Sequence, residues 1–403
     1  MPWEGVTVSE ARERLLDDWK LNYYSKTELA ERHSVARKTV YKWIDRFEQE
    51  GLAGYQEHSR RPLTCPSQTE ETVAEALIEL RKMRPNRGPA KLLDQLQRRH
   101  PDWELPSVST VARILAREGL VGARRRHRRA HPGCPKSIPE GPNDIWAADY
   151  KGQFRLKNGQ YCFPLTVSDL ASRYVLGVEA HPAVSYELTQ KHFEWLFEAY
   201  GLPNRIRTDN GVPFASSALA RLSQLSAWFI KLGIYPELIE PGKPQQNAIH
   251  ERMHRTLKQE ATIPPAASLP GQQRKLDAFR RDFNEERGHE GLGMKRPAEV
   301  YAPSLRAMPK RIEPYEYPGH YLVRRVSRCG TIRMQSEQVF VSQTLNEEHV
   351  GLEEVDDGVY DLYFCFYQIG RYHLQENRIE DIVSRVPVAR RQIDLARRVL
   401  PMS

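Results

Sequence analysis

The chain has 403 residues, of which 40% are hydrophobic and 28% charged, so we expect two or three folded domains rather than a disordered protein. We expect no signal peptide and no membrane partner, since no apolar run reaches the ~18 residues that a membrane helix needs. The five cysteines include no close pair. Their spacing favours the reducing cytoplasm and argues against a disulfide framework and a Cys-based zinc finger. The formal net charge is +8, and residues 1–140 hold 26 basic against 20 acidic groups, so we expect a polyanionic partner for this part.

Residues 1–57 are predicted to form three short helices. Apolar residues recur at helical spacing around Leu15 and Trp19, Thr27 is expected to cap the second helix, and the third covers 36–48. A short turn followed by a helix with a basic outer face is typical of a helix-turn-helix, whose last helix enters the DNA major groove. A small structural bundle with solvated lysines is the alternative. The residues expected to contact DNA here are Arg37, Lys38, Lys42 and Arg46.

Residues 58–121 repeat this rhythm, with helices predicted over 69–84, 90–99 and 108–118. They form either a second helix-turn-helix or a helical spacer. Residues 122–140 are rich in proline and arginine, so this linker is expected to bind the phosphate backbone without reading its sequence, a solvated hinge being the alternative. The arginines concerned are Arg124, Arg125, Arg126, Arg128 and Arg129.

Residues 141–302 are predicted to form an α/β domain. Strands are expected over 145–154, 161–168, 174–180, 205–208 and 235–239, and helices over 186–200, near 219–232 and from Pro244 onward. Residues 303–403 are predicted to form a small β-barrel-like domain and a tail, with strands over 321–326, 339–341, 350–355 and 359–366. Asp357-Gly358 between the last two strands is typical of a hairpin turn.

Three carboxylates of the α/β domain occupy positions that favour chemistry. Asp149 shares one face of its predicted strand with Ile145 and Ala147, where an unpartnered charge is costly. Asp209 closes a short strand, and α/β sheets carry their sites at the carboxyl ends of strands. Glu251 lies about two turns into the last predicted helix.

The polar face of that last helix suits a metal ion beside a phosphodiester. Its apolar stripe is expected at Ile249, Met253 and Leu257, and its opposite face is expected to display Asn247, Glu251, Arg255 and Lys258. Mg²⁺ takes oxygen ligands, and two such ions can activate the attacking oxygen and stabilise the leaving one. Any one of the three acids taken alone is more simply an ordinary surface or capping residue.

Two runs of sequence, 207–214 around Asp209-Asn210-Gly211 and 241–258 around Glu251, resemble the integrase core of bacterial insertion-sequence transposases, most closely the insertion sequence 481 group. Residues 326–332 and 350–356 also look like that group, whose core is related to retroviral integrases. The interval of 42 positions from Asp209 to Glu251 fits the group, while Ala248 and Met253 depart slightly from its pattern. The resemblance implies a multidomain protein with an RNase H-like core.

The same resemblance implies that Asp149, Asp209 and Glu251 form an Asp-Asp-Glu site for Mg²⁺ or Mn²⁺, as two ions. It further implies a transposase that binds the ends of its mobile element and cuts and joins double-stranded DNA, with Asn210, Asn247, Arg255 and Lys258 contacting that DNA. Joining two ends needs two active sites, so we expect a homodimer or a larger assembly on DNA, in the bacterial cytoplasm and associated with the nucleoid. A DNA-binding protein whose core does not catalyse is the alternative.

A competing motif lies in the same helix. Residues 250–254 read His-Glu-x-x-His, the signature of zinc peptidases. The extended form of that signature would need His at 260 and Gly at 257, where the chain has Glu260 and Leu257. A zinc site would also leave Asp149, Asp209 and the basic helices unexplained. Asp169, a fourth acid near the strands, is expected to make a turn before Ser172.

Overall fold

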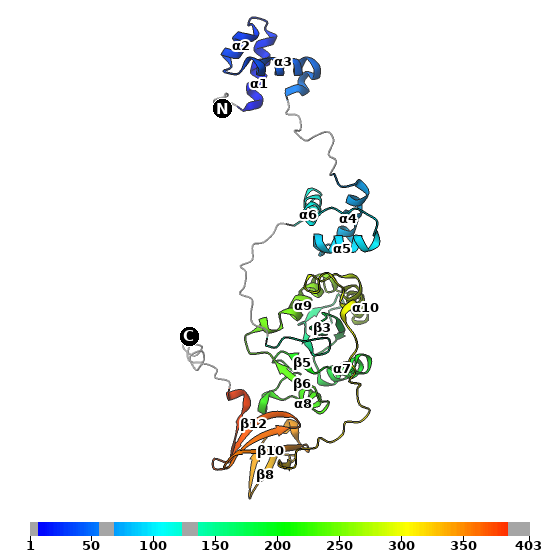
Figure 1. The fold of residues 1–403 in the computed structure, drawn as a ribbon, viewed down its shortest axis with the longest axis vertical. Helices are drawn as coiled ribbons and strands as arrows, with labels where there is room; N and C mark the ends of the chain where they lie inside the picture. The colour runs from blue at the N-terminus through cyan, green and yellow to red at the C-terminus, as the bar shows by residue number, and fades with distance from the viewer. Residues whose placement is uncertain (1–6, 56–67, 123–135, 386–403) are drawn as a thin grey trace. The chain divides into compact units, whose positions relative to one another are not determined.

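The computed structural model describes residues 7–55, 68–122 and 136–385, drawn as coloured ribbon in Figure 1. These residues belong to two compact units, which divide between Gln68 and Thr69. The linker arginines expected to bind DNA lie outside the described residues: Arg124, Arg125, Arg126, Arg128 and Arg129.

The N-terminal unit is a three-helix bundle, as predicted. Its helices are α1 (Val8–Lys20), α2 (Lys26–Arg32) and α3 (Arg37–Glu50), followed by the 3₁₀ helix η1 (Gly51–Tyr55). Leu15, Leu29 and Ile44 meet in its core without solvent exposure. The predicted cap of α2 was wrong. Ser25 caps this helix, because its side chain accepts the Glu28 amide while the Glu28 carboxylate accepts the Ser25 amide at 2.7 Å.

The second unit begins with a further helical bundle. Helices α4 (Glu71–Met83), α5 (Pro89–Arg99) and α6 (Val108–Arg117) follow the predicted ranges closely, and they enclose a leucine-rich core. Three ion pairs between described residues join this bundle to the end of the α/β domain, one of them between Arg84 and Asp282 at 2.6 Å. The buried Arg87 lies 2.6 Å from Asp282, and Arg98 lies 2.8 Å from Glu299.

A six-stranded sheet forms the centre of the α/β domain. Its strands are β1 (Ile145–Tyr150), β2 (Phe154–Arg155), β3 (Tyr161–Asp169), β4 (Val175–His181), β5 (Arg205–Thr208) and β6 (Tyr235–Leu238). Strand β3 pairs antiparallel with β1 and β4, whereas β1, β5 and β6 run parallel. The predicted strand over 145–154 is split in two, since the chain turns at Gly152 with φ +83°. An antiparallel hairpin continued by parallel strands agrees with the expected RNase H-like core.

Helices cover both faces of this sheet (Figure 1). Trp146 and Ala148 of β1 pack towards α7 (Tyr186–Tyr200) and α8 (Gln224–Lys231). The 3₁₀ helix η2 (Leu219–Arg221) precedes α8. Ile145 and Ala147, which point to the other face, meet Ile249 of α9 (Ala248–Ala261). Helix α10 (Leu269–Arg281), which we did not predict, packs beside α9 under β3 and β4. Asp149 therefore points to the α9 face.

The C-terminal part has two sheets and, in the described residues, no closed barrel, so the prediction of a barrel-like domain is not confirmed. Its strands are β7 (Leu322–Arg325), β8 (Thr331–Met334), β9 (Glu337–Phe340), β10 (His349–Asp356), β11 (Val359–Phe364), β12 (Tyr367–His373) and β13 (Arg378–Asp381). In the described residues the larger sheet has the order β13-β12-β11-β10-β7, and β8-β9 form a separate ribbon (Figure 1). The apolar face of the larger sheet packs against the β8–β9 ribbon and against Leu222 and Ile230, which lie beside and within α8. The predicted Asp357-Gly358 hairpin turn is confirmed.

Candidate active site

Asp149 lies at the carboxyl end of β1, opposite Thr166 of β3. Its side chain is only 16% exposed. Burial, followed by repulsion from Asp209 and Glu251, raises the pKa of Asp149 to about 7, and Lys151 only partly opposes this. The site therefore gathers more negative charge than its neighbours neutralise.

Asp209 reaches the same place from the adjacent strand. Ala148 of β1 pairs with Thr208 of β5, so Asp149 and Asp209 each follow a paired residue at the same edge of the sheet. The Asp209 carboxylate accepts the Gly211 amide at 3.0 Å. A Cβ atom at position 211 would lie 3.1 Å and 3.2 Å from the two carboxylate oxygens, so glycine leaves room for this turn.

Glu251 completes the acidic cluster from α9. Its side chain is exposed, and its carboxylate, that of Asp149 and the His254 imidazole each offer one ligand atom within 4.8 Å of the others. The structure thus brings Asp149 and Glu251 together, and it places Asp209 after the neighbouring strand, where its charge contributes to the raised pKa of Asp149. A cluster of carboxylate oxygens with excess negative charge fits divalent cations.

Two histidines that sequence reasoning assigned only to a zinc peptidase lie beneath the cluster. Thr166 donates its hydroxyl to the Asp149 carbonyl at 2.9 Å, and its oxygen lies 2.8 Å and 2.6 Å from the Nε2 atoms of His250 and His254. Ser168 lies 2.7 Å from the other nitrogen of His250. Burial lowers the pKa of both imidazoles. Because both His250 nitrogens are occupied, the two histidines cannot share a zinc ion, and the zinc-peptidase reading is wrong.

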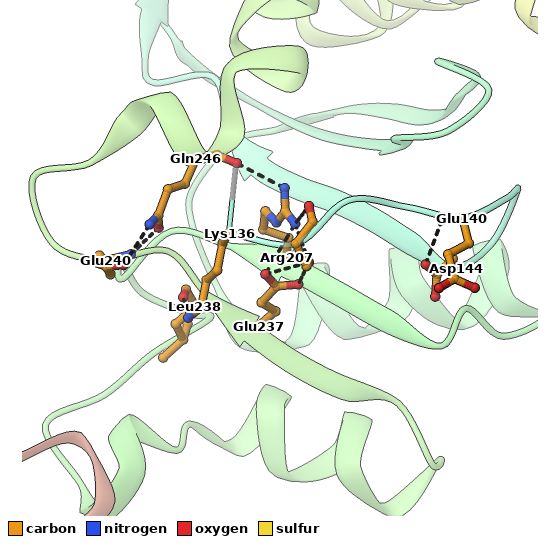
Figure 2. A network of polar contacts seen from close by, with 9 residues as sticks. Lys136, Glu140, Asp144, Arg207, Glu237, Leu238, Glu240 and Gln246 are labelled. Carbon is orange, nitrogen blue, oxygen red and sulfur yellow. Dashed lines mark hydrogen bonds and ion pairs between the residues drawn. The ribbon is translucent and has the colours of Figure 1, made fainter. Parts of the chain in front are cut away.

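A buried network holds β5 against the start of α9 (Figure 2). The Arg207 guanidinium pairs with Glu237 at 3.2 Å and donates to the Gln246 carbonyl at 3.0 Å and to the Ser137 carbonyl at 2.7 Å. Gln246 in turn bonds Glu240 through its side chain. Arg207 precedes Asp209 by two positions and Gln246 precedes Glu251 by five, so this network positions two of the acids. Sequence reasoning had no signal for it beyond a basic residue within a short strand.

The polar face predicted for α9 is only partly observed. Arg255 and Lys258 are exposed, like Glu251, but Asn247 is 4% exposed and its Oδ1 atom has no hydrogen-bond partner. Residues Pro244–Asn247 form the 3₁₀ helix η3, whose three residues per turn put Asn247 out of phase with α9. The buried face of the helix is His250, Met253, His254, Leu257 and Ala261.

Asn210 is held by two other segments, the residue after β6 and the 3₁₀ helix η2. Its amide donates to the Ile239 carbonyl at 2.7 Å, and its carbonyl accepts Arg221 at 2.7 Å. The fourth acid, Asp169, makes the predicted turn, since it accepts the Ser172 amide at 2.7 Å.

A basic cavity of about 480 Å³ opens beside α9. The residues lining it include one acid, Glu290, and five cations, which come from α5, the β3–β4 turn, α9 and the segment after α10: Lys91, Arg173, Arg252, Arg255 and Arg287. Burial, with Arg287 and Arg252 nearby, lowers the pKa of Lys91 to about 8. This concentration of positive charge suits a polyanion such as a DNA backbone.

In the N-terminal unit, the basic residues predicted for DNA binding follow the outer face of α3. Arg37, Lys38 and Lys42 are exposed. Arg46 is half-buried, with its guanidinium 4.9 Å from the centre of the Trp43 ring.

Models of known families match several stretches of the chain. Two integrase core domain models match residues 139–244 and 232–297. A helix-turn-helix domain model matches residues 11–62, and a homeodomain-like domain model matches residues 39–115.

Two relatives come from bacterial insertion elements. The insertion element IS407 uncharacterized 31.7 kDa protein of Burkholderia multivorans is 27% identical over 246 residues, which are 59% of this chain and 83% of the relative. The insertion element IS476 uncharacterized 39.2 kDa protein of Xanthomonas euvesicatoria is 27% identical over 254 residues, 62% of this chain and 70% of that protein. Among solved structures, the catalytic core domain of HTLV-2 integrase in complex with magnesium is 17% identical, with 41% of this chain and all of that one covered at a TM-score of 0.32.

The matched domains define the class: an integrase core preceded by helix-turn-helix DNA-binding domains. The chain is similar to proteins of bacterial insertion elements that have an integrase-like core, as its resemblance implied. The assignment to the insertion sequence 481 group stays a prediction. Within the described residues, no helix combines the length and apolar composition needed to cross a membrane.

Proposed function

We propose that this protein binds the ends of its own mobile element and catalyses metal-dependent cleavage and strand transfer of DNA. The observation that carries the proposal is the convergence of three carboxylates, from β1, the end of β5 and α9, on one edge of the sheet. Burial, and then repulsion from Asp209 and Glu251, raises the pKa of Asp149 to about 7. Such repulsion destabilises an ion-free site, and a divalent cation offsets it.

Asp149, Asp209 and Glu251 would hold the Mg²⁺ or Mn²⁺ ions, proposed as two. Bound divalent cations activate an attacking oxygen and stabilise a leaving one. The protein's own residues prepare the site for this chemistry. The Asp149 carboxyl gives up its proton when a cation is bound, and Arg207 keeps the strand that carries Asp209 in register with the start of α9.

DNA is proposed to reach the acids along the positive surface beside α9. Arg255 and Lys258 project from the helix that carries Glu251, and the basic cavity adds Lys91 and Arg287. These groups would hold phosphates without reading bases. The exposed residues of α3, Arg37, Lys38 and Lys42, with Arg46, are proposed to read the element ends. Asn210, which is partly exposed, is proposed to contact the DNA, whereas the burial of Asn247 contradicts the DNA contact predicted for it.

Two or more copies are proposed to assemble on DNA, because joining both ends of an element to one target needs two active sites.

Asp209→Asn tests the site. Incubating the protein with double-stranded DNA that carries the sequences flanking its own gene should give nicked or joined products in Mg²⁺ or Mn²⁺ and none with a chelator. Asp209→Asn should abolish these products and retain DNA binding. Glu198→Gln, an exposed acid on α7 across the sheet, is the matched control and should cut normally. Cleavage by Asp209→Asn would refute the site assignment, and binding without cleavage by the wild type would favour a DNA-binding protein with an inactive core.

A further inference from the structure

His254 lies three positions after Glu251 on α9, with its imidazole 1% exposed and directed at the acidic cluster. Its Nδ1 atom is 3.7 Å from Oδ2 of Asp149. Which nitrogen carries the proton decides whether Nδ1 presents an N–H group or a lone pair to that carboxylate.

The hydrogen bonds of Thr166 answer that question. Its hydroxyl has one proton, which it donates to the Asp149 carbonyl at 2.9 Å. The same oxygen lies 2.8 Å from His250 Nε2 and 2.6 Å from His254 Nε2, and it has two lone pairs to accept both. Each histidine must therefore donate from Nε2. For His250 the assignment is self-consistent, because its Nδ1 then accepts the Ser168 hydroxyl at 2.7 Å.

With its proton on Nε2, a neutral His254 presents a bare Nδ1 lone pair to the Asp149 carboxylate. Two acceptors facing each other at 3.7 Å are unfavourable unless a proton or a cation lies between them. Metal-binding histidines are held in this way, with one nitrogen bonded to a protein acceptor and the other aimed at the ion. Two ligands of one Mg²⁺ ion at ~2.1 Å lie at most ~4.2 Å apart, and the Asp149–His254 separation falls within that span.

We propose that His254 Nδ1 is a direct ligand of the cation held by Asp149 and Glu251, so that one metal position of this site is a mixed carboxylate–imidazole one. The inference rests on the proposed function for the presence of a cation. Imidazole suits transition metals better than Mg²⁺, so this position favours Mn²⁺ over Mg²⁺ more strongly than an all-oxygen site would. Thr166 is a positioning residue, because it fixes the tautomer.

Two substitutions separate the ligand role from a structural one. His254→Gln places an amide near the original Nε2 position, which preserves the bond to Thr166 but removes the nitrogen ligand. His254→Asn places a carbonyl oxygen near the original Nδ1 position, which replaces a nitrogen ligand by an oxygen one. Glu198→Gln is again the matched control, and thermal unfolding verifies that each variant is folded.

Pulsed electron paramagnetic resonance of the full chain loaded with Mn²⁺ gives the direct readout. A coordinated imidazole produces a nitrogen modulation of the Mn²⁺ signal, which we expect in the wild type and in Glu198→Gln and expect to be lost in both His254 variants. Titration calorimetry should show that His254→Gln weakens Mn²⁺ binding roughly 10-fold or more. Substituting even a residue that only hydrogen-bonds to a metal ligand weakens metal binding by at least about 10-fold. His254→Asn should lose less affinity and shift the Mn²⁺/Mg²⁺ preference towards Mg²⁺.

Mn²⁺ bound in an Asp149-dependent way without a nitrogen signal, or with one that persists in His254→Gln, would overturn the ligand assignment and leave the proposed function intact. Mn²⁺ binding that Asp149→Asn does not weaken would overturn both.

Discussion

Replacing Asp149 by asparagine is expected to make the protein more stable above neutral pH while destroying its cation site. The pKa of Asp149 rises from an ordinary value of 3.8 to about 7, through burial first and then through Asp209 and Glu251. At ~1.36 kcal/mol per pKa unit, keeping this carboxyl ionised in the folded state costs about 4 kcal/mol. The asparagine side chain, which has no charge, avoids that cost.

The sign of the pH dependence follows from proton linkage. The folded protein binds this proton more tightly than the unfolded chain, so Asp149 lowers stability progressively as the pH rises from about 4 to about 7. The advantage of Asp149→Asn should therefore be small near pH 4 and full near pH 8. For a domain of this size each kcal/mol moves the midpoint by roughly 2–4 °C, which gives an upper bound of roughly 8–16 °C near pH 8.

Scanning calorimetry of the full chain measures this difference at several pH values. Mn²⁺ should stabilise the wild type and leave Asp149→Asn unchanged, because only the wild type binds the ion. The control is Asp169→Asn. Asp169 is also buried, but its carboxylate accepts the Ser172 and Asn143 amides, each at 2.7 Å, so an amide there would face donors and destabilise the fold. A midpoint difference for Asp149→Asn that is equal near pH 4 and pH 8 would refute the reasoning.

Three further outcomes are expected. Glu237→Gln leaves the Arg207 charge buried without its partner and should lower the free energy of unfolding in urea by about 3–5 kcal/mol. Replacing both residues by apolar ones of similar volume should recover most of that loss. A double variant as unstable as the single one would contradict this. Lys42→Ala should lower the slope of log DNA affinity against log salt concentration, measured by fluorescence anisotropy, by about one phosphate contact. An unchanged slope would contradict the proposed binding of DNA by α3. Lys91→Met should weaken binding to any DNA sequence alike, so a sequence-selective loss would be inconsistent with a phosphate-binding cavity.

The sequence predicts the bounds of helices and strands correctly where interactions between neighbouring residues decide the structure. Helix α7 and strand β5 have the predicted bounds, and the bounds of α5 differ from the predicted range by one residue at its start, because their apolar periodicity and terminal residues are unambiguous. The cap of α2 was misplaced by two residues. Serine and threonine both cap helices, but only Ser25 has a glutamate three positions later, Glu28, with which it exchanges hydrogen bonds. The phase of Asn247 was missed because a 3₁₀ turn and an α-helix are hard to distinguish around Pro244.

The sequence by itself determined the order of the acids along the chain and the element that carries each one, while the class of protein came from a resemblance to a known family. The order and the elements follow from motif spacing and from hydrophobic periods of two and 3.6, which are properties of neighbouring residues. The tertiary structure alone decided how the C-terminal sheet buries its apolar face, how Arg207 ties β5 to α9, and which nitrogen of His254 faces Asp149. Those features depend on contacts between residues far apart in the chain, such as Thr166 with His254, and pairing at such distances leaves no local pattern in the sequence.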